Sequence, residues 1–150
     1  MSAETSVDAR GILAQARFFA GLQPSQLERV AALGEVRSFK ADTRIYTVGD
    51  AVDDFYVLAD GMVRFTLGLS KRDTAAGDII RRGDVFGWAA LVEGHTRRIA
   101  TAYCLTACEV VAINGAALTA LMEGDNGLGF AVMKKLAVLL TSELVILAAG

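Results

Sequence analysis

The chain has 150 residues, a formal net charge of −2 and a pI of about 5.4. This balance excludes the strongly basic proteins that bind nucleic acid non-specifically. Hydrophobic residues make up 53% of the chain and charged residues 21%, which excludes a disordered protein and fits one domain with a substantial core.

The N-terminus and the hydropathy of the chain indicate its compartment. Residues 1–10 are polar and acidic, without the basic start and apolar run of a signal peptide. The mean hydropathy of +0.42 is high, but Lys134, Lys135 and Glu143 interrupt the most apolar stretch, 128–149. Because a membrane span needs about 20 nearly uninterrupted apolar residues, we expect a cytoplasmic protein with no membrane segment.

Periodicity divides the chain into three parts. A helical pattern runs from Gly11 and breaks at Gly21. A second helix starts near Pro24, where the N–H that proline lacks would have no partner in any case. Short strands follow, and helical spacing returns after Asn114, a residue type that favours helix N-caps. We expect one domain over residues 1–150, made of N-terminal helices (1–33), a β part (34–113) and C-terminal helices (114–150).

The middle part alternates strand-forming residues with turn residues. β-Branched and aromatic residues dominate the segments that lie between Gly-Asp and Asp-Gly pairs. Strands that recur every ~8–12 residues with turns between them indicate an antiparallel sandwich or barrel. The predicted strands lie within residues 44–48, 55–58, 62–67, 79–81 and 99–113.

The last helix carries more apolar surface than its own domain needs. After a break at residues 124–127, apolar residues recur at alternating spacings of three and four, the a/d pattern of a coiled coil. Other apolar residues widen the stripe beyond the ~100° face that one core requires. We therefore favour a homodimer through this helix, the alternative being that the whole helix packs on its own domain. The predicted seam consists of Phe130, Met133, Ala137, Leu140, Leu144 and Leu147.

Residues 83–91 have the parts of an anion-binding site. Gly83 and Gly87 allow a tight turn, and the small residues that follow let backbone N–H groups approach a ligand closely. Arg97 and Arg98 then return at the start of a predicted strand. A guanidinium and the N-terminus of a helical turn together suit a phosphate.

Several stretches spread over the chain match the pattern of one family. They are Phe18 and Phe19 with Leu22 and Leu27, then Gly49-Asp50, 55–58 with Gly61, 86–101, 106–110 and 141–143. With them the chain resembles the cyclic-nucleotide-binding-domain family, especially the sensor half of catabolite-activator-type bacterial regulators. The resemblance covers nearly the whole chain. It implies a mainly β fold, an antiparallel β-roll or jelly roll of about eight strands, with N-terminal helices and a long C-terminal helix.

The resemblance also implies roles for residues of the predicted anion site. Arg98 takes the place of the arginine that pairs with the cyclic phosphate, and the backbone of residues 87–90 lies beside it. Thr141 and Ser142 stand where the long helix of the family closes over the purine. The implied ligand is cyclic AMP or cyclic GMP, with no cofactor and no metal. The residues expected to bind it are Phe86, Gly87, Trp88, Ala89, Ala90, Leu91, Arg98, Ile99, Thr141 and Ser142.

Trp88 departs from the family pattern. The residue after the Phe-Gly pair is usually a glutamate that accepts a hydrogen bond from the ribose 2′-hydroxyl, and indole can only donate. A buried hydroxyl left without its partner costs ~1–3 kcal/mol, which is about a 5–150-fold loss of affinity. The indole can stack on a different planar ligand, or it can fill the pocket as part of the core.

The remaining charged and polar residues have simpler interpretations. Arg97 and Arg98 point to opposite faces of a strand. We expect Arg98 to point inward, where it binds the ligand or pairs with Asp84 or Glu93. His95 is the only histidine and is expected in an exposed loop, which disfavours a metalloenzyme with several imidazole ligands.

These features predict a regulatory sensor rather than an enzyme, since no nucleophile lies near a base in a plausible arrangement. Cys104 and Cys108 are expected to be buried thiols of a reducing compartment. Ligand binding would be signalled through the C-terminal helix to an unidentified protein partner. The alternatives are an adaptor with a filled pocket that binds no nucleotide and, third, an enzyme that uses the barrel interior. The sequence contains no helix-turn-helix after the long C-terminal helix, so we expect no specific DNA binding by the chain alone.

Overall fold

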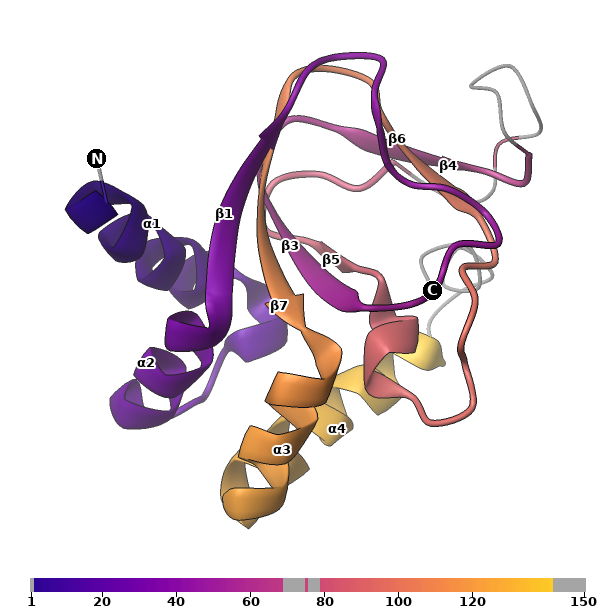
Figure 1. The fold of residues 1–150 in the computed structure, drawn as a ribbon. Helices are drawn as coiled ribbons and strands as arrows, with labels where there is room; N and C mark the ends of the chain where they lie inside the picture. The colour runs from indigo at the N-terminus through magenta and orange to yellow at the C-terminus, as the bar shows by residue number, and fades with distance from the viewer. Residues whose placement is uncertain (1, 69–74, 76–78, 142–150) are drawn as a thin grey trace.

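The computed structural model describes residues 2–68, 75 and 79–141, with side chains from residue 9 onward. Two antiparallel sheets form a β-roll, and the helices gather beside and below it (Figure 1). The mainly β fold with flanking helices that the sequence predicts is therefore confirmed.

One sheet has four strands in the order β1-β7-β3-β5, and the other has three in the order β2-β6-β4. Every pairing is antiparallel. The strands of the first sheet are β1 (Gly34–Phe39), β3 (Asp54–Asp60), β5 (Val85–Phe86) and β7 (Cys108–Asn114). Those of the second are β2 (Arg44–Tyr46), β4 (Val63–Thr66) and β6 (Thr101–Cys104).

The four-stranded sheet is buried on both faces at its centre. In β3, the four residues from Phe55 to Leu58 are all buried, without the alternation of a strand that has one face in water. The Phe55 ring lies 5.1 Å from the ring of Phe18 and 6.3 Å from that of Phe19, centroid to centroid. The N-terminal helical segment thus covers the outer face, and the inner face lines the roll.

The N-terminal helices follow the predicted breaks. Gly21 has a φ of +91°, which ends the first helical segment, and Pro24 opens the next helix. The first helix starts well before the predicted Gly11, because residues 2–10 contain Ala and Glu and no strong helix breaker. The elements are α1 (Ser2–Gln15), the 3₁₀ turn η1 (Arg17–Phe19) and α2 (Pro24–Leu33).

Two capped helices follow β7. Asn114 caps α3 (Gly115–Gly124) as predicted, since its side chain accepts a hydrogen bond from the Ala117 N–H at 2.9 Å. Asp125 then caps α4 (Asn126–Leu140) by accepting from the Leu128 N–H at 3.1 Å. The break predicted at residues 124–127 is therefore a single capping residue between two helices.

α4 has one buried apolar face and one exposed apolar face. Leu128, Val132 and Leu136 are buried against the domain. Phe130 is 71% exposed and Met133 39% exposed. Ala137 and Leu140 are exposed as well, while Leu144 and Leu147 lie outside the described residues. The described part of the predicted seam therefore faces away from the domain.

The strand predictions need two corrections. The described residues contain seven strands, in agreement with the expected number of about eight, but residues 79–81 form a single bridge, between Ile80 and Val63, and not a strand. The segment 99–113 is two strands in different sheets instead of one. The turn between them is held by the Thr106 hydroxyl, which accepts the Met62 N–H at 3.1 Å.

Candidate functional site

The predicted anion site is a tight turn between two sheets. β5 ends at Phe86, Gly87 adopts a φ of +75°, and the 3₁₀ turn η2 (Trp88–Leu91) follows at once. A Cβ at Gly87 would lie 3.0 Å from Cδ2 of Tyr56 and 3.1 Å from Nη1 of Arg98. Only glycine fits, because the backbone is left-handed here and because the neighbouring side chains press against it.

Arg98 points into the molecule and Arg97 points out, as expected. Arg98 is 3% exposed, and its Nη2 donates a short hydrogen bond to the carbonyl oxygen of Asp54. Arg97 is exposed and reaches the Gly49 carbonyl at 3.4 Å. One guanidinium is therefore held inside the roll, against the Gly87 turn.

Aromatic rings from both sheets surround that guanidinium. The Cζ of Arg98 lies 4.2 Å from the ring centroid of Tyr46 and 5.9 Å from that of Tyr56. Tyr56 is stacked on Phe86 with centroids 5.0 Å apart, and Tyr46 lies 5.9 Å from Tyr56. Cation–π attraction stabilises such an arginine where water is excluded. Charge and rings form one compact group on the inner wall.

Tyr46 and Asp54 were not identified from the sequence. Tyr46 is 6% exposed, and its hydroxyl has no hydrogen-bond partner within the described part of the chain. Burial raises the pKa of this phenol, and the charge of Arg98 opposes that rise more weakly. The inward direction of Tyr46 was recognisable in principle from strand alternation, whereas the contact of the Asp54 carbonyl depends on the fold.

Sequence comparison decides the family once this geometry is known. The model of the cyclic nucleotide-binding domain matches residues 36–125, which include most of β1, all of β2 to β7, and α3. The chain belongs to this family. A comparison with curated protein sequences found no match.

Solved structures resemble this cyclic nucleotide-binding domain along most of its length. A candidate cyclic nucleotide-binding protein from Geobacter metallireducens GS-15 is 27% identical, with a TM-score of 0.74, and the match covers 84% of this chain and 90% of that chain. The sensor domain of the transcriptional regulator DNR from Pseudomonas aeruginosa is 18% identical, with a TM-score of 0.74 and 90% of each chain covered.

A cAMP-bound structure is also similar. The regulatory domain of Toxoplasma gondii PKA, crystallised with cAMP, is 22% identical with a TM-score of 0.65. The match covers 78% of this chain but 44% of the Toxoplasma chain, so this domain corresponds to less than half of that protein. At this identity, as for the DNR sensor domain, the similarity establishes the fold alone.

Trp88 belongs to the buried interior of the domain. It is 4% exposed, and its ring makes a T-shaped contact with that of His95, with centroids 5.4 Å apart. His95 itself is exposed, as predicted. Ala89 and Leu91 are buried beside Trp88, and Ala90 is half-buried. The first turn of η2 therefore packs as core, and Trp88 brings no acceptor to the site.

The other predicted site residues lie elsewhere. Ile99 is 41% exposed and points away from the side on which Arg98 is buried. Thr141 is exposed, and its hydroxyl donates to the carbonyl oxygens of Ala137 and Val138 in its own helix, at 3.0 and 3.1 Å. Ser142 lies outside the described residues.

The carboxylates considered as partners of Arg98 have other positions. Asp84 forms an ion pair with Arg17 at 2.6 Å, and Glu93 is exposed. Asp54 pairs through its side chain with Arg37 at 3.1 Å, while its carbonyl accepts from Arg98. One partner of Arg98 is thus a backbone carbonyl, a type of contact that residue identity does not reveal.

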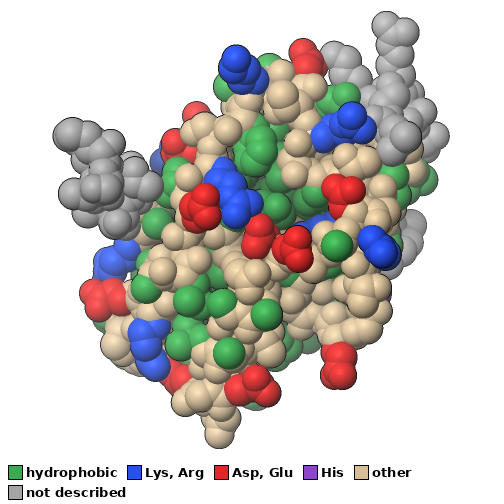
Figure 2. Space-filling model, in the orientation of Figure 1, with side chains coloured by type: hydrophobic (Ala, Val, Ile, Leu, Met, Phe, Trp, Pro, Cys, Tyr) green, Lys and Arg blue, Asp and Glu red, His purple; other side chains and the backbone are tan. Residues whose placement is uncertain are grey.

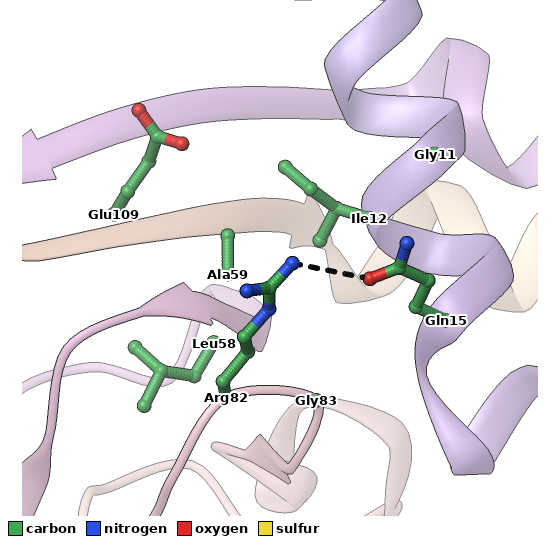
Figure 3. A pocket seen from close by; sticks show the side chains of 8 residues that line it. All are labelled: Gly11, Ile12, Gln15, Leu58, Ala59, Arg82, Gly83 and Glu109. Atoms are coloured by element: carbon green, nitrogen blue, oxygen red, sulfur yellow. Dashed lines mark hydrogen bonds between the residues drawn. The ribbon is translucent and has the colours of Figure 1, made fainter.

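A hollow lies outside the roll, between α1 and the outer face of the sheet. It has a volume of about 390 Å³. In Figure 3, Arg82 reaches across it to Gln15, which accepts a hydrogen bond at 3.4 Å, while Glu109 projects from β7. This hollow shares no lining residue with the Arg98 site.

Surface charge and the grouping of polar side chains bear on nucleic-acid and metal binding. On the face shown in Figure 2, acidic and basic side chains are interspersed and form no basic patch. Among the residues that the structure describes, no three His, Cys, Asp or Glu side chains are grouped so that they could hold a metal ion. Within the same residues, no helix has the length and apolarity to cross a bilayer.

Cys104 and Cys108 are buried free thiols, as predicted.

Proposed function

We propose that the domain is a regulatory module, not an enzyme, that binds a cyclic nucleotide inside its β-roll. The observation that supports this most directly is the buried Arg98 guanidinium, held against the left-handed Gly87 turn. A fixed cation beside backbone N–H groups at the start of η2 suits the cyclic phosphate of cyclic AMP or cyclic GMP. Membership of the family supports the same ligand class.

Ligand binding at this site would change the positions of the C-terminal helices. Ala90 in η2 touches the start of α3, since a Cβ at Gly115 would lie 2.3 Å from the Ala90 carbonyl oxygen. A ligand that shifts η2 must therefore shift α3, and α4 follows α3 after one residue, Asp125. Because packed elements move as rigid units between discrete positions, the ligand would change the position of α4. An unidentified protein partner would detect that change.

The experiment is calorimetric titration of the full chain with cyclic AMP and with cyclic GMP. Arg98→Lys retains the charge but loses the planar fork that binds phosphate in a bidentate way. We expect wild-type binding in the micromolar range or tighter, and a loss of at least about tenfold in Arg98→Lys. Arg97→Lys is the matched control, since Arg97 is adjacent and exposed, and it should bind as wild type does. Absence of heat up to millimolar ligand would contradict the proposal.

We further propose that two copies pair through α4. The apolar side chains of Phe130, Met133, Ala137 and Leu140 are exposed on one face of the helix. Their spacing of three and four residues is self-complementary in a coiled coil, so the expected occupant is a second copy of the chain. The sequence continues this spacing to Leu144 and Leu147.

The second candidate function is an adaptor that binds no nucleotide. Trp88 is buried, and the rings of Tyr46, Tyr56 and Phe86 pack around Arg98. In this function the same side chains fill the interior of the roll as ordinary core. The titration described above separates the two functions, because an adaptor gives no heat with either nucleotide while still forming a dimer.

A further inference from the structure

The hydroxyl of Tyr46 is the unexplained polar group of this interior. Tyr46 is 6% exposed, and its oxygen has no hydrogen-bond partner anywhere in the described residues. A buried hydroxyl without a partner destabilises the fold, and a phenylalanine would fill the same space without that cost. A group of this kind in a binding domain calls for a role in the bound state.

The ring of Tyr46 cannot take its hydroxyl to water. It lies under the Arg98 guanidinium, 4.2 Å from Cζ to the centroid, and beside the stacked rings of Tyr56 and Phe86, with centroids 5.9 and 6.2 Å away. Tyr56 and Phe86 lie on β3 and β5 of the opposite sheet, and Arg98 lies just before β6, so a movement of the ring would disturb the whole group. The partner must therefore come to the hydroxyl.

The chemistry of the hydroxyl defines the partner. Burial raises the pKa of Tyr46, so the phenol stays protonated at neutral pH and can donate a hydrogen bond. Its neighbour Arg98 is a cation with donors only. Two adjacent donors, one of them charged, favour an anion with more than one acceptor oxygen.

We propose that the Tyr46 hydroxyl donates a hydrogen bond to the oxyanion that Arg98 binds. This inference rests on the proposed function and specifies how the ligand is recognised. The two exocyclic oxygens of a cyclic phosphate provide one acceptor for the guanidinium and one for the phenol. Trp88 supplies no acceptor for a ribose hydroxyl, so recognition depends on the phosphate more than on the sugar.

The test combines Tyr46→Phe with calorimetry and thermal unfolding of the full chain. Removal of the hydroxyl should weaken cyclic AMP binding by about 10–100-fold, the effect of a hydrogen bond to a charged group. The melting temperature of the ligand-free variant should equal or exceed that of the wild type, because the lost hydroxyl has no partner in the free protein. The affinity ratio between wild type and Tyr46→Phe should be the same when 2′-deoxy cyclic AMP, which lacks only the ribose 2′-hydroxyl, replaces cyclic AMP.

Tyr103→Phe is the matched control. Tyr103 lies on β6 between the fully buried Ala102 and Cys104, so its ring faces away from the roll interior. This variant should change neither affinity nor melting temperature.

Three outcomes would overturn the inference, and they are distinguishable. Equal affinity of Tyr46→Phe and wild type for cyclic AMP would refute the role of the hydroxyl but leave the proposed function standing. A lower melting temperature of ligand-free Tyr46→Phe would show that the hydroxyl has a structural partner instead. No binding of either cyclic nucleotide by the wild type would refute the proposed function together with this inference.

Discussion

Trp88 shows how one residue can decide between a pocket and a core. It stands where the family places an acceptor for the ribose, and it is buried with only 4% of its surface exposed. Removal of an indole from a packed interior leaves a cavity, which typically costs ~3–5 kcal/mol. We therefore expect Trp88→Ala to lower the free energy of unfolding by about this amount, as measured by urea denaturation.

The neighbour of Trp88 provides the control for that measurement. His95 is exposed and forms a T-shaped ring contact with the indole, so His95→Ala should cost no more than the ~0.5–1.5 kcal/mol of an aromatic pair. A Trp88→Ala protein as stable as wild type would mean that the indole is kept for a ligand contact and not for the core.

A second residue-scale prediction concerns the thiol of Cys104. Burial, followed by the neighbouring Cys108, raises the pKa of this thiol to about 12. The thiolate is the reactive form, so at pH 7–8 the native protein should react with a maleimide only as fast as it unfolds. Addition of urea should accelerate the reaction steeply. Fast labelling of native Cys104→Ala, in which Cys108 remains, would assign any residual reactivity to Cys108.

The pH dependence of Cys104 has a definite sign. At a pH above the ordinary pKa of a cysteine, the thiol stays protonated in the folded state but ionises in the unfolded chain. The contribution of this thiol to stability is therefore present below the ordinary pKa of ~8.5 and is lost progressively as the pH rises above it. A Cys104→Ala variant should lose this part of the alkaline slope.

The sequence predicted the orientation of Arg98 but not the role of Tyr46. The direction of Arg98 followed from strand alternation and from its spacing to Ala100 and Thr101, both of which are local. Tyr46 sits on a short strand that was predicted correctly, yet its meaning depends on Arg98, which is distant in sequence. The orphan hydroxyl is visible only when the partners of every atom are known.

At the scale of elements, Asp125 joins three helices. It follows α3, caps α4, and pairs with Arg29 of α2 at 2.7 Å. The hydrogen bond from the Leu128 N–H, together with Gln26 and Arg29, lowers the pKa of its carboxyl. The folded protein therefore binds this proton less readily than the unfolded chain does.

The stability that Asp125 contributes should be lost in acid. It is fully present above the ordinary pKa of ~4 for an aspartate, and it falls as the pH drops through the lower folded value. Asp125→Asn keeps a side chain that caps helices but cannot titrate. We expect the variant to show a shallower loss of melting temperature as the pH falls below about 4. An identical acid slope in both proteins would contradict this role.

The contact between η2 and α3 should transmit changes in the binding turn. At Gly115 a Cβ would lie 2.3 Å from the Ala90 carbonyl oxygen and 2.8 Å from its Cβ, so Gly115→Ala must push the two elements apart. We expect at least tenfold weaker cyclic AMP binding by calorimetry and a lower melting temperature. Gly124→Ala in the same helix meets no atom within 4 Å. It should leave binding unchanged and slightly raise stability through helix propensity.

Element boundaries could be predicted where a local signal exists and not elsewhere. Asn114 and Pro24 define helix starts through their own chemistry, and both predictions were correct. The division between β6 and β7 has no Gly or Pro to indicate it. That turn is stabilised by the contact of Thr106 with the distant Met62, which no window of sequence contains.

At the scale of the molecule, the described residues form a chain of contacts from the interior to the surface. Arg98 and Gly87 contact each other inside the roll, and the turn after Gly87 reaches α3 through Ala90 and Gly115. α3 leads directly into α4, whose exposed apolar face is the proposed dimer surface. A change at the binding turn therefore has a short, continuous route to the surface where a second chain would pack.

The proposed dimer depends on the exposed apolar face of α4, so a charge on that face should weaken dimerisation. Phe130 is the most exposed apolar side chain of the predicted seam, at 71%. In a two-fold dimer, Phe130→Glu would place two like charges within an apolar interface and remove an aromatic contact. We expect wild type to sediment as a dimer at tens of micromolar, and the variant to dissociate with at least about 30-fold weaker affinity.

Val138→Glu is the matched control for the seam. Val138 is 63% exposed on the same helix, but it lies away from the a/d positions, because one residue beyond Ala137 turns the side chain by ~100°. This variant should remain dimeric, and both variants should keep the melting temperature of a folded monomer, because neither side chain belongs to the core. If Val138→Glu dissociates as fully as Phe130→Glu, α4 pairs through a different face. If the wild type sediments as a monomer, the apolar face must serve a partner other than a second copy, and the route from Arg98 to α4 would then end on that partner.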